Sequence, residues 1–164
     1  MLYCYMASPI GDLLLAGDAD SLCIIGFPEG KGRVEPGRDW IESDARFSEE
    51  RQQLAEYFEG KRQVFSLTLS PTGTVFQRQV LDALQEIPFG RTCSYRDIAE
   101  RIGRPKAVRA VGAANGRNPI PIVIPCHRVI GADGSLTGFG GGLAAKSWLL
   151  SHEGCSPGSQ ETLF

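Results

Sequence analysis

The sequence predicts a chain of two unlike units, an α/β unit followed by a mainly helical one. Short apolar runs separated by turn residues fill the start of the chain, whereas capped helical patterns dominate after residue 70. Charge divides at the same place, because residues 1–70 hold 7 Lys or Arg against 12 Asp or Glu, and residues 71–164 hold 10 against 7. The 164 residues suffice for one ordinary domain or two small ones.

The first unit is expected to begin with three strands in an antiparallel meander. The apolar runs that predict these strands, each bounded by turn residues, are 2–6, 12–16 and 22–27. A loop is expected over 29–39. A helix follows over 44–58, because Phe47 and Leu54 recur at helical spacing. Alternation of apolar and polar residues then predicts a closing strand over 65–69.

The boundary between the units is predicted at Ser70-Pro71-Thr72-Gly73, a cluster of turn residues. We therefore expect an N-terminal α/β domain over 1–70 and a C-terminal domain over 71–156. A polar tail over 157–164 carries no motif that predicts a function.

Three short helices are predicted at the start of the second unit. Thr74 caps the first, Ser94 and Asp97 form a capping box that opens the second, and the third runs over 106–115. The second and third are joined by Gly103-Arg104-Pro105. This arrangement predicts a helix-turn-helix, whose second helix reads the base pairs in proteins that bind DNA.

A basic segment overlaps the predicted helix-turn-helix. Residues 91–128 contain eight Arg or Lys and only two acids. Lys106, Arg109 and Ala113 share one helical face, with Gly112 beside them, so cations stand among residues small enough to allow close approach. The pattern favours a polyanion partner such as DNA. A solvated basic helix that binds nothing is the alternative.

The run 118–130 carries the strongest chemical signal. Its prolines bracket an apolar stretch that would make a poor central strand, since proline donates no backbone hydrogen bond. Pro125 fixes the backbone before Cys126, and His127 supplies an imidazole of the kind that activates a thiol. Neighbouring residues of an extended chain point to opposite faces, so a turn or a bridging water must bring the two groups together. An inert buried cysteine is the alternative.

Two features further along the chain could complete a site. A helix predicted over 143–153 ends at Glu153, where an acid opposes the helix dipole and so indicates a special role, such as orienting a histidine. An ordinary surface charge is the alternative. The glycine-rich loop 138–142 fits no phosphate-binding fingerprint, and no nucleotide cofactor is expected. Its amides and the ring of Phe139 suit the wall of a pocket for a base.

Together these residues resemble a known family, the O6-alkylguanine-DNA alkyltransferases, also called methylated-DNA-protein-cysteine methyltransferases. The motifs that carry the resemblance are Pro125-Cys126-His127-Arg128-Val129, Arg109-Ala110-Val111-Gly112, Asn118-Pro119, Gly141-Gly142-Leu143 and His152-Glu153-Gly154. The likeness is close over 76–154 and looser before it. It implies an N-terminal ribonuclease-H-like α/β domain and a mainly helical C-terminal domain with a winged-helix-like helix-turn-helix.

The resemblance also implies a reaction. A guanine that carries an O6-alkyl group is flipped out of duplex DNA approached through the minor groove, and its alkyl group passes irreversibly to the protein's own cysteine. Each molecule would act once, and O4-alkylthymine is a further candidate substrate. No metal and no organic cofactor is implied. Some members hold a structural zinc, but the first unit here has only Cys4 and Cys23 and no histidine, too few for four ligands.

Carried over by position, the resemblance assigns three groups of residues. The catalytic group holds the alkyl acceptor, the base, the residue that orients the base and the brace of the cysteine segment, in that order Cys126, His127, Glu153 and Asn118. The DNA-binding group, beginning with the finger that fills the space left by the base, is Arg109, Tyr95, Lys106, Ser94, Ala110 and Gly112. The base-pocket group is Val129, Phe139, Gly140 and Tyr95. Many members have tyrosine where Phe139 stands, which makes the alkyl-size preference an open question.

Other functions stay open beside this one. A related protein could bind alkylated DNA without transferring the alkyl group, although Cys126 argues against that. A Cys-His-Glu hydrolase would turn over a cleavable substrate, and a DNA-binding regulator would use the helix-turn-helix alone.

The cellular setting follows from composition. No apolar run reaches the roughly 20 residues that span a bilayer. Five cysteines at irregular spacing indicate a reducing compartment rather than a disulfide framework. We therefore expect a cytoplasmic protein that acts as a monomer on duplex DNA.

Overall fold

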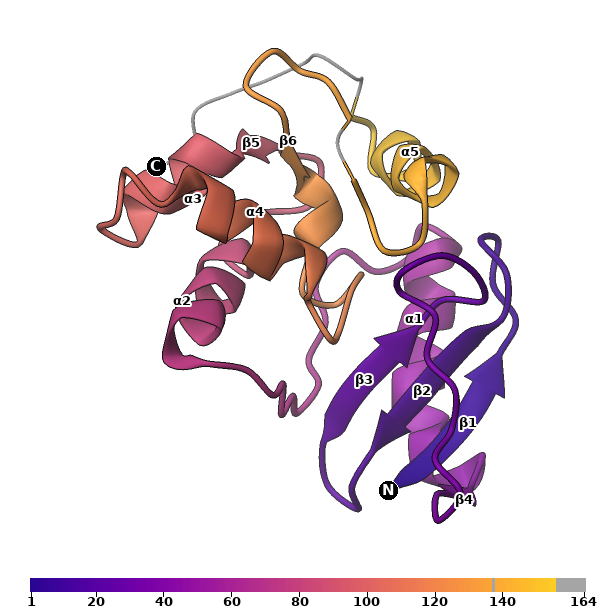
Figure 1. Ribbon diagram of the computed structural model, residues 1–164. Coiled ribbons are helices and arrows are strands. Elements are labelled where there is room, and N and C mark those ends of the chain that lie inside the picture. The colour runs from indigo at the N-terminus through magenta and orange to yellow at the C-terminus, as the bar shows by residue number, and fades with distance from the viewer. Residues whose placement is uncertain (137, 156–164) are drawn as a thin grey trace.

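The first unit is built on a four-stranded sheet. The computed structural model describes residues 1–136 and 138–155, and its sheet has the strand order β3-β2-β1-β4 (Figure 1). The strands are β1 (Leu2–Met6), β2 (Leu13–Gly17), β3 (Leu22–Gly26) and β4 (Ile41–Glu42). Strands β1 to β3 pair in antiparallel fashion, which confirms the predicted meander, and β4 adds to β1 in parallel.

A helix covers one face of this sheet. The short 3₁₀ helix η1 (Ala45–Phe47) leads into α1 (Ser48–Phe58), which lies behind the sheet in Figure 1. The side chains of Phe47, Leu54 and Tyr57 are fully buried. All five residues of β2 are buried as well, because this central strand is covered on both faces. The helix expected in this half is therefore confirmed.

The predicted closing strand over 65–69 is wrong. Leu69 forms one isolated bridge with Leu22, and the rest of the segment is irregular. At Ser66 the side chain of Gln53 on α1 takes the place of a partner strand, since its Oε1 accepts from Ser66 N at 2.9 Å and its Nε2 donates to Ser66 O at 3.3 Å. Leu22 supplies the pairing around Leu69, where Leu22 N donates to Thr68 O and Ser70 N donates to Leu22 O, both at 2.9 Å. The sequence also does not predict β4, because a two-residue strand has no period to detect.

Helices dominate the described part of the second unit. They are α2 (Val75–Leu84), α3 (Tyr95–Arg101), α4 (Val108–Gly116) and α5 (Leu143–His152). Thr74 caps α2, and Ser94 with Asp97 caps α3, as predicted. Helix α4 begins two residues later than expected, because a turn comes first, in which Ala107 N donates to Arg104 O at 2.9 Å. Helices α3 and α4 pack against each other, as a helix-turn-helix requires.

A small parallel pair of strands connects the cysteine segment to α3. These strands are β5 (Cys93–Ser94) and β6 (Val129–Ile130), and both are buried. The 3₁₀ helix η2 (Cys126–Arg128) runs directly into β6. The strand that follows η2 is therefore held beside the two residues that precede α3.

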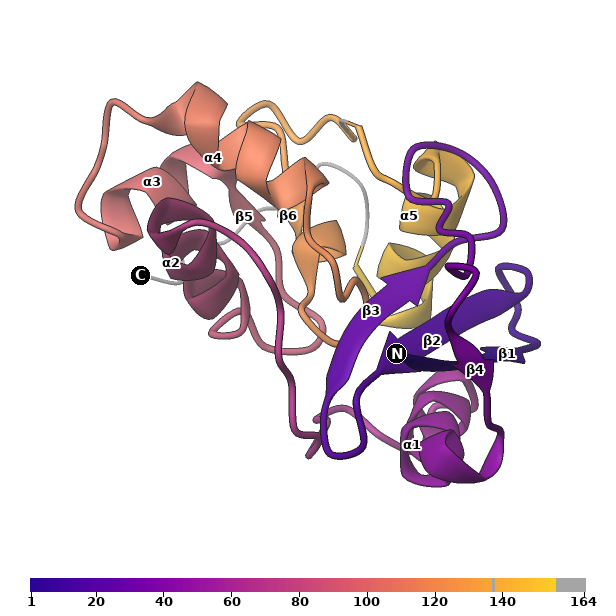
Figure 2. The same ribbon diagram turned by 60° about the horizontal axis from the view of Figure 1, so that its bottom comes forward.

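The two units meet beside the cysteine segment. Ile25 N at the end of β3 donates to Pro119 O at 2.9 Å, and Gly32 N donates to Gly140 O at 2.8 Å. The rings of Phe27 and Phe139 meet edge to face, with centroids 5.3 Å apart. Helix α5 lies next to the first unit in both views (Figures 1 and 2). No helix among the described residues has the length and apolar character needed to cross a membrane.

Candidate active site

A tight bend before Cys126 is built around the side chain of Asn118. Its Oδ1 accepts from Ile120 N at 3.0 Å, and its Nδ2 donates to Ile124 O at 2.7 Å. The buried Ile122 at the tip has a φ of 75°, which is rare for a β-branched residue and costs free energy. The bend is thus held by an amide bonded on both sides, and it delivers the chain to the cysteine.

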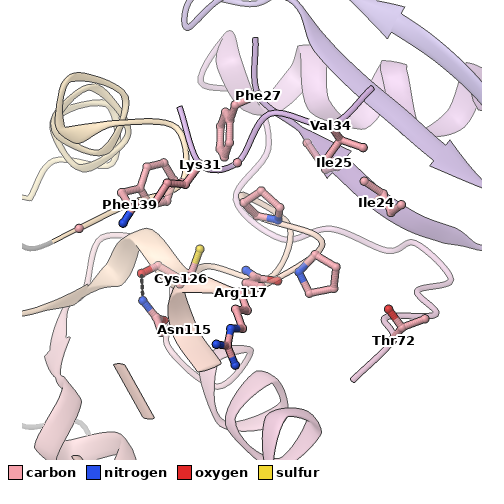
Figure 3. A pocket seen from close by; sticks show the side chains of 17 residues that line it. Ile24, Ile25, Phe27, Lys31, Val34, Thr72, Asn115, Arg117, Cys126 and Phe139 are labelled. Atoms are coloured by element: carbon pink, nitrogen blue, oxygen red, sulfur yellow. Dashed lines mark hydrogen bonds between the residues drawn. The ribbon is translucent and has the colours of Figure 1, made fainter. Parts of the chain in front are cut away.

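Cys126 opens η2 and its sulfur points into a cavity between the two units (Figure 3). The cavity has a volume of about 260 Å³, and its walls include Ile24 and Val34 of the first unit together with Asn118 and Phe139 of the second. Burial raises the pKa of the Cys126 thiol to about 11, although the Asn118 amide and a nearby lysine act in the opposite direction. The resting sulfur is therefore a thiol, and a base is needed to activate it.

His127 follows Cys126 in η2 and is fully buried. Its Nε2 is 2.7 Å from Glu153 Oε2, and its Nδ1 has no hydrogen-bond partner among the described residues. Burial lowers the pKa of His127, so the resting ring is neutral. The neutral ring donates from Nε2 to the carboxylate, which leaves Nδ1 as a free acceptor. This tautomer is the one that a proton-accepting histidine needs.

Glu153 follows the last residue of α5 and is held by many donors. Arg128 Nε donates to Oε1 at 2.7 Å and Arg128 Nη2 to Oε2 at 3.0 Å, while the Tyr57 hydroxyl donates to Oε2 at 2.6 Å. Burial alone would raise the pKa of Glu153, but the bonds from His127 and Arg128 outweigh it and hold that pKa well below its usual range. The predicted link between His127 and Glu153 thus exists in the structure, and the carboxylate is permanently charged.

Arg128 and Tyr57 take part in this network, although sequence reasoning did not find them. Arg128 also donates from Nη1 to Ile87 O at 2.7 Å, and Tyr57 reaches the site from α1 of the first unit. A signal for the arginine existed, because a buried acid at a helix end requires a cation and Arg128 adjoins the histidine. No local signal existed for Tyr57, which lies 96 positions from Glu153.

Lys146 is a second residue that sequence reasoning did not find. It is fully buried, and its Nζ donates to Val129 O at 2.7 Å. Burial lowers the pKa of Lys146 to about 8, against the attraction of Cys126. A signal existed here too, because Lys146 shares the inner face of α5 with the buried Leu149 and Leu150.

Asn115 on α4 completes the inner wall. Its Nδ2 donates to Cys126 O at 3.4 Å, and its Oδ1 has no partner in the described part of the chain. Asn115 is buried and lines the same cavity as the sulfur. The carbonyl of the cysteine is therefore tied to the helix that was expected to read DNA.

A second cavity of about 630 Å³ adjoins the first and shares part of the glycine-rich loop with it. Of the predicted DNA-binding and base-pocket residues, it brings together Tyr95, Gly112, Phe139 and Gly140. Val129 is buried and lines neither cavity. The loop 138–140 thus forms a wall of both spaces, one that holds the sulfur and one that lies against α3 and α4.

The other predicted DNA-binding residues lie outside both cavities. Lys106, Arg109 and Ala110 are exposed, Lys106 on the turn before α4 and the other two on its first turn. Ser94 is buried, and its hydroxyl accepts from Asp97 N at 3.1 Å. The structure uses Ser94 as the cap of α3, and its role in DNA binding stays a prediction.

Comparison with protein families matches nearly the whole chain. Residues 75–155 match the DNA-binding domain of 6-O-methylguanine DNA methyltransferase, and residues 1–71 match its ribonuclease-like domain. These two ranges follow the two units of the structure. The predicted α/β fold with a helical second part is thereby confirmed.

Curated relatives extend over the same length. A methylated-DNA-protein-cysteine methyltransferase of Methanosarcina acetivorans is 51% identical over 94% of this chain and 99% of its own. One of Mycobacterium leprae is 46% identical over 100% of this chain and 99% of its own.

Solved structures show the same architecture. The Mycobacterium tuberculosis OGT in complex with DNA superposes with a TM-score of 0.88 at 46% identity, covering 93% of this chain and 92% of that one. The O6-methylguanine methyltransferase of the same organism gives 0.86 at 46% identity, covering 96% and 95%. Because its fold and nearly its whole length are matched, this chain belongs to the O6-methylguanine DNA methyltransferase family.

Proposed function

We propose that this protein repairs alkylated DNA by moving the O6-alkyl group of a guanine in duplex DNA onto Cys126 Sγ, once per molecule. The observation that carries the proposal is the arrangement around that sulfur. It faces a cavity, and the next residue is a neutral histidine whose Nδ1 has no partner among the residues that the structure describes and whose Nε2 bonds a charged carboxylate. This is the order of groups needed to take a proton from a thiol.

The chemistry balances without a co-reactant. The Cys126 proton passes through a water to His127 Nδ1, and Glu153 stabilises the imidazolium that forms. The thiolate attacks the carbon bound to O6, an S–C bond forms, the C–O bond breaks, and its electron pair stays on the guanine. The guanine takes the proton back from the relay. The products are an S-alkylcysteine, which the protein cannot reverse, and a normal base.

The helical unit would deliver the base. Lys106 and Arg109 stand exposed at the start of α4, where cations can contact phosphates and an inserted arginine can fill the space of the flipped nucleotide. Tyr95 and Phe139 line the cavity of about 630 Å³ next to the sulfur and offer rings to a base. Extruding the base costs a few kcal/mol, which these contacts offset.

The setting belongs to the same proposal. All groups of the relay come from one chain, so a monomer suffices. A thiol nucleophile works only where thiols stay reduced, which points to the cytoplasm.

Mass spectrometry tests the proposal directly. We expect one added methyl on the peptide that contains Cys126 after mixing with a duplex that carries one O6-methylguanine, saturating at one per molecule. Cys126→Ser should bind the duplex but take up no methyl, and Cys93→Ser is the matched control, since that buried cysteine lines neither cavity and should leave uptake intact. An unmodified protein with the lesion still bound would support a lesion binder instead, and repeated release of product would support a hydrolase.

A further inference from the structure

The side chain of Tyr57 crosses from the first unit into the relay of the second. It projects from the last turn of α1, and its ring packs against rings from both units. The ring centroids lie 5.5 Å from Phe65, 6.2 Å from Phe89 and 5.1 Å from His152. His152 Nε2 also lies 2.6 Å from Tyr57 O. The ring is therefore fixed by packing that does not involve its hydroxyl.

The Tyr57 hydroxyl makes one short hydrogen bond, and its acceptor is the carboxylate oxygen of Glu153 that also bonds His127. Tyr57 Oη donates to Glu153 Oε2 at 2.6 Å, and His127 Nε2 lies 2.7 Å from the same atom. Both side chains are shielded from solvent, Tyr57 being 0% exposed and Glu153 5%. In such surroundings a hydrogen bond to an anion is strong and directional.

The phenol acts on the carboxylate in a way that Arg128 cannot. Arg128 supplies the countercharge and spans both oxygens, whereas Tyr57 is neutral and donates to Oε2 alone. Burial and the nearby charge of Glu153 raise the pKa of Tyr57, so its hydroxyl remains a donor at every working pH. A donor on Oε2 orients that oxygen and weakens its attraction for a proton on His127.

We propose that Tyr57 is a positioning residue for alkyl transfer, which orients Glu153 Oε2 toward His127 and limits the basicity of the imidazole. This rests on the roles proposed above for His127 and Glu153. The first unit thereby takes part in the chemistry through one hydroxyl group. The other charged or titratable groups around the imidazole are Glu153 and Arg128 beside it, Lys146 on α5, and Cys126 before it.

Single-turnover kinetics with Tyr57→Phe test the proposal. The variant keeps the ring and loses only the hydroxyl, so we expect methyl transfer from bound O6-methylguanine to slow by about tenfold at pH 7 while the Kd for DNA stays the same. Tyr3→Phe is the matched control, because its hydroxyl also faces a carboxylate, Glu42 at 3.5 Å, but on β1 far from the cysteine. That control should transfer at the wild-type rate.

The pH profile supplies a readout that simple loss of packing would not move. Without the hydroxyl, Oε2 holds an imidazolium more strongly, so His127 becomes protonated at higher pH and the acid limb of the rate profile shifts upward. The slowing should therefore shrink as the pH is raised toward 9. An unshifted profile with an unchanged rate would overturn the proposal.

A double-mutant cycle separates action through the histidine from action on the fold. In a His127→Gln background, which leaves the Glu153–Arg128 pair intact, Tyr57→Phe should change the remaining rate by less than about twofold. An equal loss in both backgrounds would overturn the proposal. If the wild-type protein itself gains no methyl on Cys126, the proposed function fails, which is a different result from an effectless Tyr57→Phe in an active protein. Thermal unfolding of each variant ensures that only folded protein is compared.

Discussion

Lys146 shows how a single buried cation can serve the cysteine at a cost to stability. Its Nζ bonds Val129 O, and its charge lowers the pKa of Cys126 in opposition to burial. With Lys146→Met the thiol should ionise at higher pH, so the reaction of Cys126 with iodoacetamide in the absence of DNA should slow several-fold at pH 8. Lys61→Met, at an exposed lysine, should leave that rate unchanged. An unaltered rate in the Lys146 variant would show that the ammonium does not act on the sulfur.

The same lysine predicts how stability changes with pH. Its pKa falls from 10.5 when unfolded to about 8 when folded, so between these values the unfolded chain binds more protons. The contribution of Lys146 to the free energy of unfolding is therefore lowest below pH 8, and it rises toward pH 10.5 by roughly 1 kcal/mol per pH unit. Urea unfolding of the wild type and of Lys146→Met at pH 7.5 and 9.5 checks this prediction. The free energy of unfolding of the wild type should increase relative to that of the variant as the pH is raised. A constant difference would contradict the prediction.

At the scale of elements, the caps of α2 and α3 make a matched pair. Thr74 and Ser94 both accept from the backbone of the residue three positions on, Gln77 and Asp97. Thr74→Ala and Ser94→Ala should each lower the free energy of unfolding by about 1 kcal/mol. Because Ser94 is buried and engaged in its cap, we expect its variant to bind duplex DNA within twofold of wild type, which fluorescence anisotropy measures. Weaker binding by Ser94→Ala alone would restore its predicted contact with DNA.

The elements also show where sequence reasoning succeeds. The starts of the two capped helices, α2 and α3, are predicted correctly, since a cap is a local feature of four residues. The strand over 65–69 fails because the Gln53 side chain bonds the backbone of Ser66, and β3 pairs with the segment only at Leu22. The parallel pair β5–β6 has two residues in each strand and leaves no periodic trace.

For the site, the chemical types were enough to select Cys126, His127 and Glu153 and to predict that the last two interact. They were not enough to find Tyr57, Lys146 or Asn115. Each of these acquires its partner only in the folded chain, across 96, 17 and 11 positions of the sequence, respectively. For Lys146 and Asn115 the one trace in the sequence is a polar residue at a position of the apolar helix face, and for Tyr57 there is none.

At the scale of the whole molecule, the carboxylate of Glu153 bonds residues of both units. The packing of the two units against each other is therefore sensitive to acid. The folded pKa of Glu153 is depressed, so its contribution is complete above the unfolded value of 4.5 and is lost as the pH falls below it. The wild type should lose stability on acidification through this range, measured by urea unfolding between pH 6 and 3.5. Glu153→Gln should start less stable, because Arg128 is left unpaired, and should show a flatter acid dependence. Parallel curves for the two proteins would contradict this account.

The contact between Gly32 and Gly140 limits the space beside Cys126. A Cβ on Gly32 would lie 2.9 Å from the Gly140 carbonyl carbon and 2.7 Å from the ring of Phe27, so no larger residue fits without displacing the loop. Gly32 and Gly140 both line the cavity that Cys126 faces, so a backbone segment of the first unit limits the size of that cavity. Exchanging residues 28–34 would therefore change which alkyl groups the cavity admits. The cysteine and the residues of its proton relay would stay unchanged.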